Sequence, residues 1–200
     1  MGSKSNMVTV SSMAYGRPAR HRRALERFGL SETEDGTFAG VVDAGKVRKL
    51  EKMCKRWHLD FRYADRFGQR STDYRRKFFQ QVKPVFGKYY FCAYCGMPLT
   101  KEKMTIDHIY PVHLASSDIK TRKRMKKAGL SGVNDIRNLV PACYGCNKRK
   151  GTRTGGWVIK GRIGRKQGLW PLRWTLRILL MSALMVTCMY LAWQYMQYLP

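Results

Sequence analysis

Four cysteines in the middle of the chain are spaced like metal ligands. They form two Cys-x-x-C pairs, separated by residues 96–142: Cys92, Cys95, Cys143 and Cys146. Two such pairs, each on a tight turn, make a tetrahedral four-thiolate site for zinc. The alternative, disulfides or unrelated thiols, is disfavoured because the N-terminal region lacks a secretory signal and a reducing compartment keeps thiols free. The sequence therefore predicts a structural zinc. The other two cysteines, Cys54 and Cys188, are expected to be free and buried.

A carboxylate and an imidazole stand side by side between the two cysteine pairs. Asp107 and His108 follow the β-prone segment 104–106, so we expect both at the end of a strand. A neutral imidazole can accept a proton near pH 7, and a carboxylate can bind a hard divalent cation. Hydrolysis of a phosphodiester needs both an activated water and a cation on the phosphate. The pair is therefore a candidate for that chemistry.

The order of these motifs resembles the HNH endonuclease family. The matching segments are CAYC at 92–95, DHIYP at 107–111, NLV at 138–140 and CYGCNKRKG at 143–151. They span about 60 of the 200 residues. The resemblance implies an α+β chain with a ββα-metal (His-Me finger) core, supported by the four-cysteine zinc site. It also implies an enzyme that hydrolyses phosphodiester bonds in DNA.

The resemblance assigns roles to single residues. His108 is the expected general base, and Asp107 and Asn147 are the expected ligands of a catalytic metal. Because an amide oxygen is a poorer ligand than imidazole for soft metals, this set favours Mg²⁺ or Mn²⁺. Asn138 matches the middle motif residue, which in the family ties the hairpin together and orients the base. Phosphate contacts are expected from the basic residues of the following helix, Lys148, Arg149 and Lys150.

A zinc module with a basic helix could also bind DNA without cutting it. Binding alone, however, needs neither the Asp107-His108 pair nor Asn147. We therefore favour an active nuclease, and the alternative is a catalytically silent DNA-binding module tethered to a membrane. His113, five residues after His108, is expected to be a solvated loop histidine.

The chain has a large excess of positive charge, with 39 Lys and Arg against 13 Asp and Glu and a formal net charge of +26. Such an excess points to nucleic acid or to an anionic membrane surface. Many basic residues gather in 118–129, a predicted helix that Asp118 can cap. We favour a clamp on the DNA backbone over a merely solvated face. The predicted DNA contacts are Arg122, Lys123, Arg124, Lys126 and Lys127.

Basic additions are expected around this core. Val47, Leu50, Cys54 and Trp57 recur at helical spacing in a basic helix, and a second basic helix is predicted over 72–82. The predicted organisation is a basic, mostly disordered arm (1–45), a basic helical region (46–90), the nuclease core (91–155, with a helical insertion at 114–130) and a basic linker (156–173).

The last 23 residues, Ile178 to Pro200, contain no charged side chain. A segment of this length is long enough for a transmembrane helix. Trp174 and Trp193 would lie about 29 Å apart on such a helix, close to the hydrocarbon thickness. The basic residues before it favour the cytoplasm for that side. We predict a membrane-spanning helix over 174–198 that holds the chain at the cytoplasmic face. The alternatives are a buried helix in an oligomer and a helix lying on a membrane surface.

Overall fold

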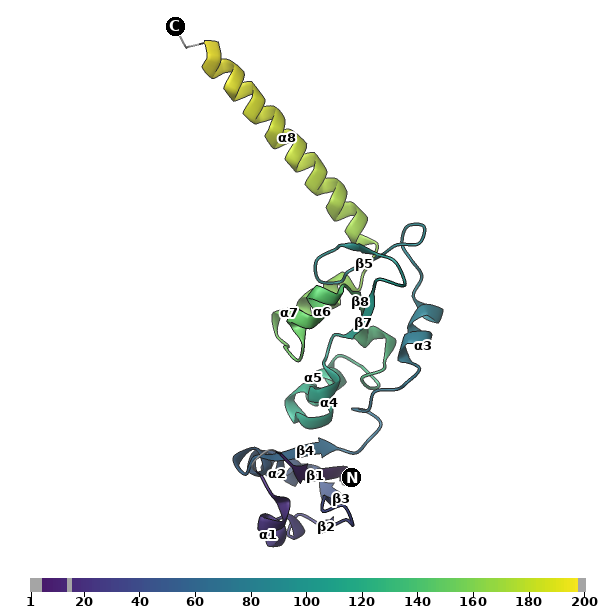
Figure 1. The fold of residues 1–200 in the computed structure, drawn as a ribbon, viewed down its shortest axis with the longest axis vertical. Helices are drawn as coiled ribbons and strands as arrows, with labels where there is room; N and C mark the ends of the chain where they lie inside the picture. The colour runs from purple at the N-terminus through teal and green to yellow at the C-terminus, as the bar shows by residue number, and fades with distance from the viewer. Residues whose placement is uncertain (1–4, 14–15, 198–200) are drawn as a thin grey trace.

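The computed structural model describes residues 5–13 and 16–197 and shows a mixed α+β chain. Figure 1 shows three parts in sequence along its long axis. An N-terminal sheet lies at one end, two small sheets with their helices lie in the middle, and a long C-terminal helix leaves the opposite end.

The N-terminal part is a four-stranded antiparallel sheet in the order β2-β3-β1-β4. Its strands are β1 (Ser5–Ser12), β2 (Leu30–Glu32), β3 (Phe38–Asp43) and β4 (Leu59–Tyr63). Its helices are η1 (Pro18–His21), α1 (Arg22–Glu26) and α2 (Ala44–Arg56). Val8 and Val10 alternate inward from β1 and pack with Leu50 of α2 in a fully buried core.

This sheet differs from the disordered arm predicted for residues 1–45. The prediction missed it because each strand contributes few inward apolar residues, such as Phe38 and Val42 of β3. The numerous basic residues lie between these positions and dominate the composition. The sheet is assembled by pairing β1 with β3 and β4, which are distant in sequence and leave no local periodic signal.

The middle part contains two two-stranded antiparallel sheets. One joins β5 (Tyr90–Phe91) to β6 (Pro98–Leu99), and the other joins β7 (Thr105–His108) to β8 (Leu139–Ala142). In the second sheet, His108 pairs with Leu139. The helices of this part are α3 (Tyr74–Gln81), α4 (Val112–Ser117), α5 (Ile119–Lys127), η2 (Ile136–Asn138) and α6 (Tyr144–Lys150). The segment between β7 and β8 is thus helical.

Residues 156–173 form helical structure and not the predicted linker. Helix α7 (Gly156–Gly164) packs against the turn of the first cysteine pair. A Cβ atom on Gly164 would overlap the carbonyl group of Ala93, and one on Gly161 would lie 3.1 Å from Ile109. Two of the glycines that suggested a flexible segment, Gly161 and Gly164, are therefore sites of close helix packing.

Helix α8 (Leu169–Gln197) is long and apolar enough to cross a membrane, by length and composition, and its apolar window is 0% buried. It begins five residues earlier than predicted. Its first turn belongs to the globular part, because the Trp170 ring is buried against Gly96, and Trp174 Nε1 donates a hydrogen bond (3.0 Å) to the Gly96 carbonyl. Cys54 is buried as expected, whereas Cys188 on α8 is exposed.

The packing of α7 makes a testable prediction. Gly164→Ala should destabilise the fold by roughly 1–3 kcal/mol, because the added methyl meets backbone that cannot rotate away. The matched control is Gly156→Ala on the same helix, whose Cβ would meet nothing within 4 Å. It should be neutral or slightly stabilising. Thermal unfolding of both variants in a neutral detergent measures the difference, and equal melting temperatures would contradict the packing described.

Candidate active site and metal centre

The four cysteines of the two pairs converge on one point. Their Sγ atoms all lie within 4.8 Å of one another, and the Cys95 and Cys143 sulfurs are 4.0 Å apart. A tetrahedron of thiolates around zinc, with Zn–S bonds of about 2.3 Å, has edges of about 3.8 Å. None of the four is in a disulfide. The cluster can therefore hold a metal ion of this kind.

Local structure explains why the sulfurs meet. The first pair lies on the turn between β5 and β6. Gly96 of this turn has a φ of +78°, a backbone conformation that residues with a side chain adopt only with strain. The second pair spans the end of β8 and the start of α6, with Cys143 as the N-cap residue. Backbone amides point at the sulfurs, since Cys143 N donates to Cys92 Sγ and Cys146 N donates to Cys143 Sγ, both at 3.4 Å.

A second site lies beside this cluster, in a cavity of about 320 Å³. Asp107 and His108 reach it from β7, and Asn147 reaches it from α6. The structure therefore brings together the three polar residues that the sequence singled out as base and metal ligands. Further residues complete the lining, among them Arg70, Tyr74, Arg75 and Thr105.

The imidazole of His108 is largely buried, with 7% exposure, and its Nε2 atom has no hydrogen-bond partner in the described part of the chain. Burial lowers the pKa of His108 to about 4, and the positive charges of Arg70 and Lys150 act in the same direction. A hydrogen bond with the Asn134 side chain opposes the shift. His108 is therefore neutral at pH 7, with a nitrogen available to accept a proton.

The carboxylate of Asp107 is held by two donors, the buried Lys150 and the half-buried Tyr94. Lys150 Nζ lies 3.0 Å from its Oδ2, and the Tyr94 hydroxyl donates to the same oxygen. Lys150 Nζ also donates to the His108 carbonyl at 2.7 Å. Burial lowers the pKa of Lys150, and the Asp107 charge counteracts this. The network fixes both the carboxylate and the backbone of His108.

Two of the predicted DNA contacts have side chains that lie inside the protein, so neither is available at the surface. Lys150 is 1% exposed and forms an ion pair with Asp107. Arg122 is 4% exposed, forms an ion pair with Asp65 and stacks 3.9 Å from the ring centre of Tyr63. Arg122 thereby joins the insertion to β4 of the N-terminal sheet. The other six predicted contacts are exposed: Lys123, Arg124, Lys126, Lys127, Lys148 and Arg149.

The two motif asparagines differ in surroundings. Asn147 Nδ2 donates to Thr105 Oγ1 at 3.1 Å, and its amide oxygen accepts no hydrogen bond within the described ranges. Asn138 is fully buried and does not line the cavity. It accepts from the Tyr110 amide (2.8 Å) and donates to the Val133 carbonyl (2.9 Å). It thus ties the segment after β7, which follows His108, to the segment before β8.

Sequence reasoning missed Arg70, Tyr74 and Arg75, which approach the cavity from outside the motif. Arg70 donates to the Tyr74 hydroxyl and lies 4.4 Å from its ring centre, and the Tyr74 ring is 5.2 Å from that of His108. Arg75 is anchored by the carbonyls of Lys101 and Met104. In the sequence these residues look like one more basic helix. His113 is exposed, but on α4 and not in a loop.

Comparison with known proteins finds a match in the middle of the chain. Residues 92–153 match the family described as HNH endonuclease, in agreement with the resemblance noted in the sequence. The chain is similar to the CRISPR-associated endonuclease Cas9 of Corynebacterium diphtheriae, with 37% identity over 60 residues. The aligned part is 30% of this chain and 4% of that protein, so the chain spans a small fraction of the relative's length. No solved structure matches.

The cysteine cluster leads to a prediction on metal removal. The protein should retain about one zinc per chain, and Cys143→Ser should lose it together with cooperative unfolding, because such sites contribute folding energy directly. Cys188→Ser, an exposed cysteine on α8, is the matched control and should keep the metal. Elemental analysis and thermal unfolding measure both effects. A folded, metal-free parent protein would rule out a structural metal.

Proposed function

We propose that this chain is a metal-dependent endonuclease that hydrolyses phosphodiester bonds in DNA and is held at the cytoplasmic face of a membrane by α8. The observation that carries the nuclease assignment is the buried His108 Nε2, which lacks a partner among the described residues and shares one cavity with Asp107 and Asn147. A binding module would have no use for a desolvated, unpaired imidazole nitrogen, which is costly to bury.

The surroundings of the cavity support a ββα-metal core. Strands β7 and β8 are paired antiparallel, and α6 follows β8 directly. His108 lies at the end of the first strand, and Asn147 lies one turn into the helix. The cysteine cluster bridges the turn before β7 to the start of α6, so a zinc ion there would lock the helix against the hairpin.

Asp107 and Asn147 would hold the catalytic cation. The fit is chemical, because a carboxylate and an amide oxygen that accepts no hydrogen bond within the described ranges face the same cavity, and Mg²⁺ and Mn²⁺ prefer oxygen ligands. When bound, such an ion would polarise the phosphate and stabilise the negative charge that develops on its oxygens. Lys150 and Tyr94 keep the Asp107 carboxylate in one orientation.

His108 would act as the general base. Its neutral imidazole would accept a proton at Nε2 from a water molecule while the water oxygen forms a bond to phosphorus. The bond from phosphorus to one deoxyribose oxygen would break, and that leaving oxygen would take a proton from solvent. Asn138 keeps the following backbone in place, and Lys150 holds the His108 carbonyl. Arg70, at the edge of the cavity, is suited to contact a phosphate oxygen and to stabilise its charge in the transition state.

The DNA backbone would be bound by exposed basic side chains on two helices, α6 and α5. Those of α6 are Lys148 and Arg149, and those of α5 are Lys123, Arg124, Lys126 and Lys127. Contacts of this kind fix the register of the duplex and make binding dependent on salt.

The catalytic assignment is tested with His108→Ala. Cleavage of plasmid DNA in Mg²⁺ or Mn²⁺ should fall by roughly 10²–10⁴-fold, the contribution of a general base, with DNA affinity retained. His113→Ala, an exposed histidine five residues away, should cut like the parent. If the His108 variant cleaves DNA as fast as the parent protein, His108 is not the general base. A parent protein that binds plasmid DNA but never cuts it would favour the silent binding module.

The membrane assignment rests on α8, a helix of 29 residues that is apolar enough to cross a membrane and whose apolar window is 0% buried. Within this helix no charged side chain follows Arg177. The basic residues before that point favour a cytoplasmic location for the N-terminal end of the helix. The exposed apolar surface would be covered by lipid, since monomeric soluble proteins rarely leave patches of this size in water.

Truncation separates the anchor from the domain. A chain ending at Thr175 should leave the membrane fraction yet keep cleavage activity, because it retains the contacts of Gln167, Trp170 and Trp174 with the globular part. A chain ending at Lys166 lacks all three and should be unstable, although the sequence alone suggests a linker there. Fractionation with an alkaline wash measures membrane attachment. A full-length protein in the soluble fraction would rule out the anchor.

A further inference from the structure

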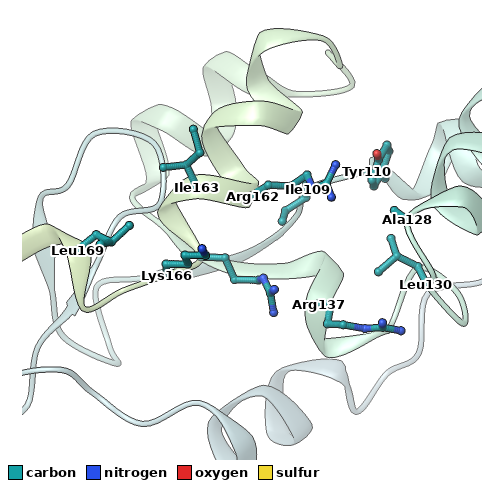
Figure 2. A pocket seen from close by; sticks show the side chains of 10 residues that line it. Ile109, Tyr110, Ala128, Leu130, Arg137, Arg162, Ile163, Lys166 and Leu169 are labelled. Carbon is teal, nitrogen blue, oxygen red and sulfur yellow. The ribbon is translucent and has the colours of Figure 1, made fainter.

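A second cavity, of about 370 Å³, lies apart from the candidate active site, and no residue lines both. It is formed where the insertion, η2, α7 and the first turn of α8 meet. Figure 2 shows Leu130 and Arg137 on one side of it and Ile163, Lys166 and Leu169 on the other. Nothing in the proposed cleavage reaction uses this cavity.

The rim of the cavity is strongly cationic. Arg162, Arg165 and Lys166 are exposed, and none of the three has an ion pair in the part of the chain that the structure describes. Arg137 also lines the cavity, but its charge is balanced by Asp135 at 2.6 Å. Three unbalanced positive charges at one opening attract an anion.

The walls are apolar where the cavity meets α8. Ile163 is 50% exposed, and Leu169, the first residue of α8, is 41% exposed. From Leu169 the exposed apolar surface continues along the helix through Leu172 and Leu176. The site therefore offers cations at one end and a continuous apolar track at the other, which matches an amphiphile with an anionic head.

The position along α8 fits the headgroup layer of a bilayer. If Trp174 lies at the hydrocarbon boundary, Leu169 is about 7.5 Å outside it at about 1.5 Å per residue. Each headgroup layer is roughly 5–7 Å thick. Leu169 and the adjoining cationic rim would then lie at the outer edge of the headgroup layer.

We propose that this cavity binds the headgroup of an anionic phospholipid, with the acyl chains lying along α8. The proposal rests on the membrane anchor proposed above. DNA is the competing polyanion, but the apolar walls formed by Ile163 and Leu169 offer nothing to a phosphodiester backbone and match an acyl chain. The lipid would fix the globular domain against the membrane surface.

The test uses the full chain in neutral detergent with phosphatidylglycerol or phosphatidylcholine added, and native mass spectrometry to count bound lipids. The parent should bind one phosphatidylglycerol with clear preference over phosphatidylcholine. The variant Arg162→Gln/Arg165→Gln/Lys166→Gln should lose roughly 100-fold in affinity, as expected from the loss of three cations facing one phosphate.

A matched control removes the same charge elsewhere. Lys123→Gln/Lys126→Gln/Lys127→Gln, all exposed on α5, should keep the phosphatidylglycerol preference. Equal losses in both variants, or equal binding of the two lipids by the parent, would overturn the proposal. A cavity variant that keeps its lipid but loses plasmid-DNA affinity would also overturn it and would reassign the cavity to DNA. Lipid binding is measured without any cleavage assay. Its outcome is therefore independent of whether the protein cuts DNA.

Discussion

The site depends on one buried ion pair, between Lys150 and Asp107. Burying two charges costs several kcal/mol each, and the geometry must compensate through further hydrogen bonds. Here Lys150 also donates to the His108 carbonyl, and Asp107 also accepts from the Tyr94 hydroxyl. These side chains come from three different elements, namely α6, β7 and the turn of the first cysteine pair. The pair is therefore stable when all three elements are in position.

This dependence links the metal centre to the chemistry. Tyr94 lies between Cys92 and Cys95, so the turn that supplies two sulfurs also supplies a hydrogen bond to Asp107. Cys146 and Lys150 are likewise one helical turn apart on α6. A change in the cysteine cluster would thus move both partners of the carboxylate. The cluster would therefore influence the position of the Asp107 carboxylate as well as the fold around it.

The sequence alone predicted the parts of the site that follow each other within short motifs. The cysteine pairs, Asp107-His108 and Asn147 have characteristic spacings, and the structure gathers them as those spacings indicate. What could not be predicted depends on contacts between distant segments. Arg70 and Tyr74 reach the cavity by tertiary packing, and Arg122 and Lys150 look like surface cations until their acidic partners are known. The N-terminal sheet and α7 were missed because basic and glycine-rich composition hid their packed positions.

The junction between the globular domain and α8 has a mechanical consequence. Trp170 packs on Gly96 next to Cys95, and Trp174 is hydrogen-bonded to the same glycine, so the start of the helix is fixed to the turn of the first cysteine pair. In a bilayer, a helix of this length adjusts its tilt to the local hydrocarbon thickness, commonly by about 20° from the normal. If α8 spans a membrane as proposed, the candidate site would turn with the helix that is packed against the turn of the first cysteine pair. The local thickness of the membrane would then influence the angle at which the proposed nuclease meets DNA.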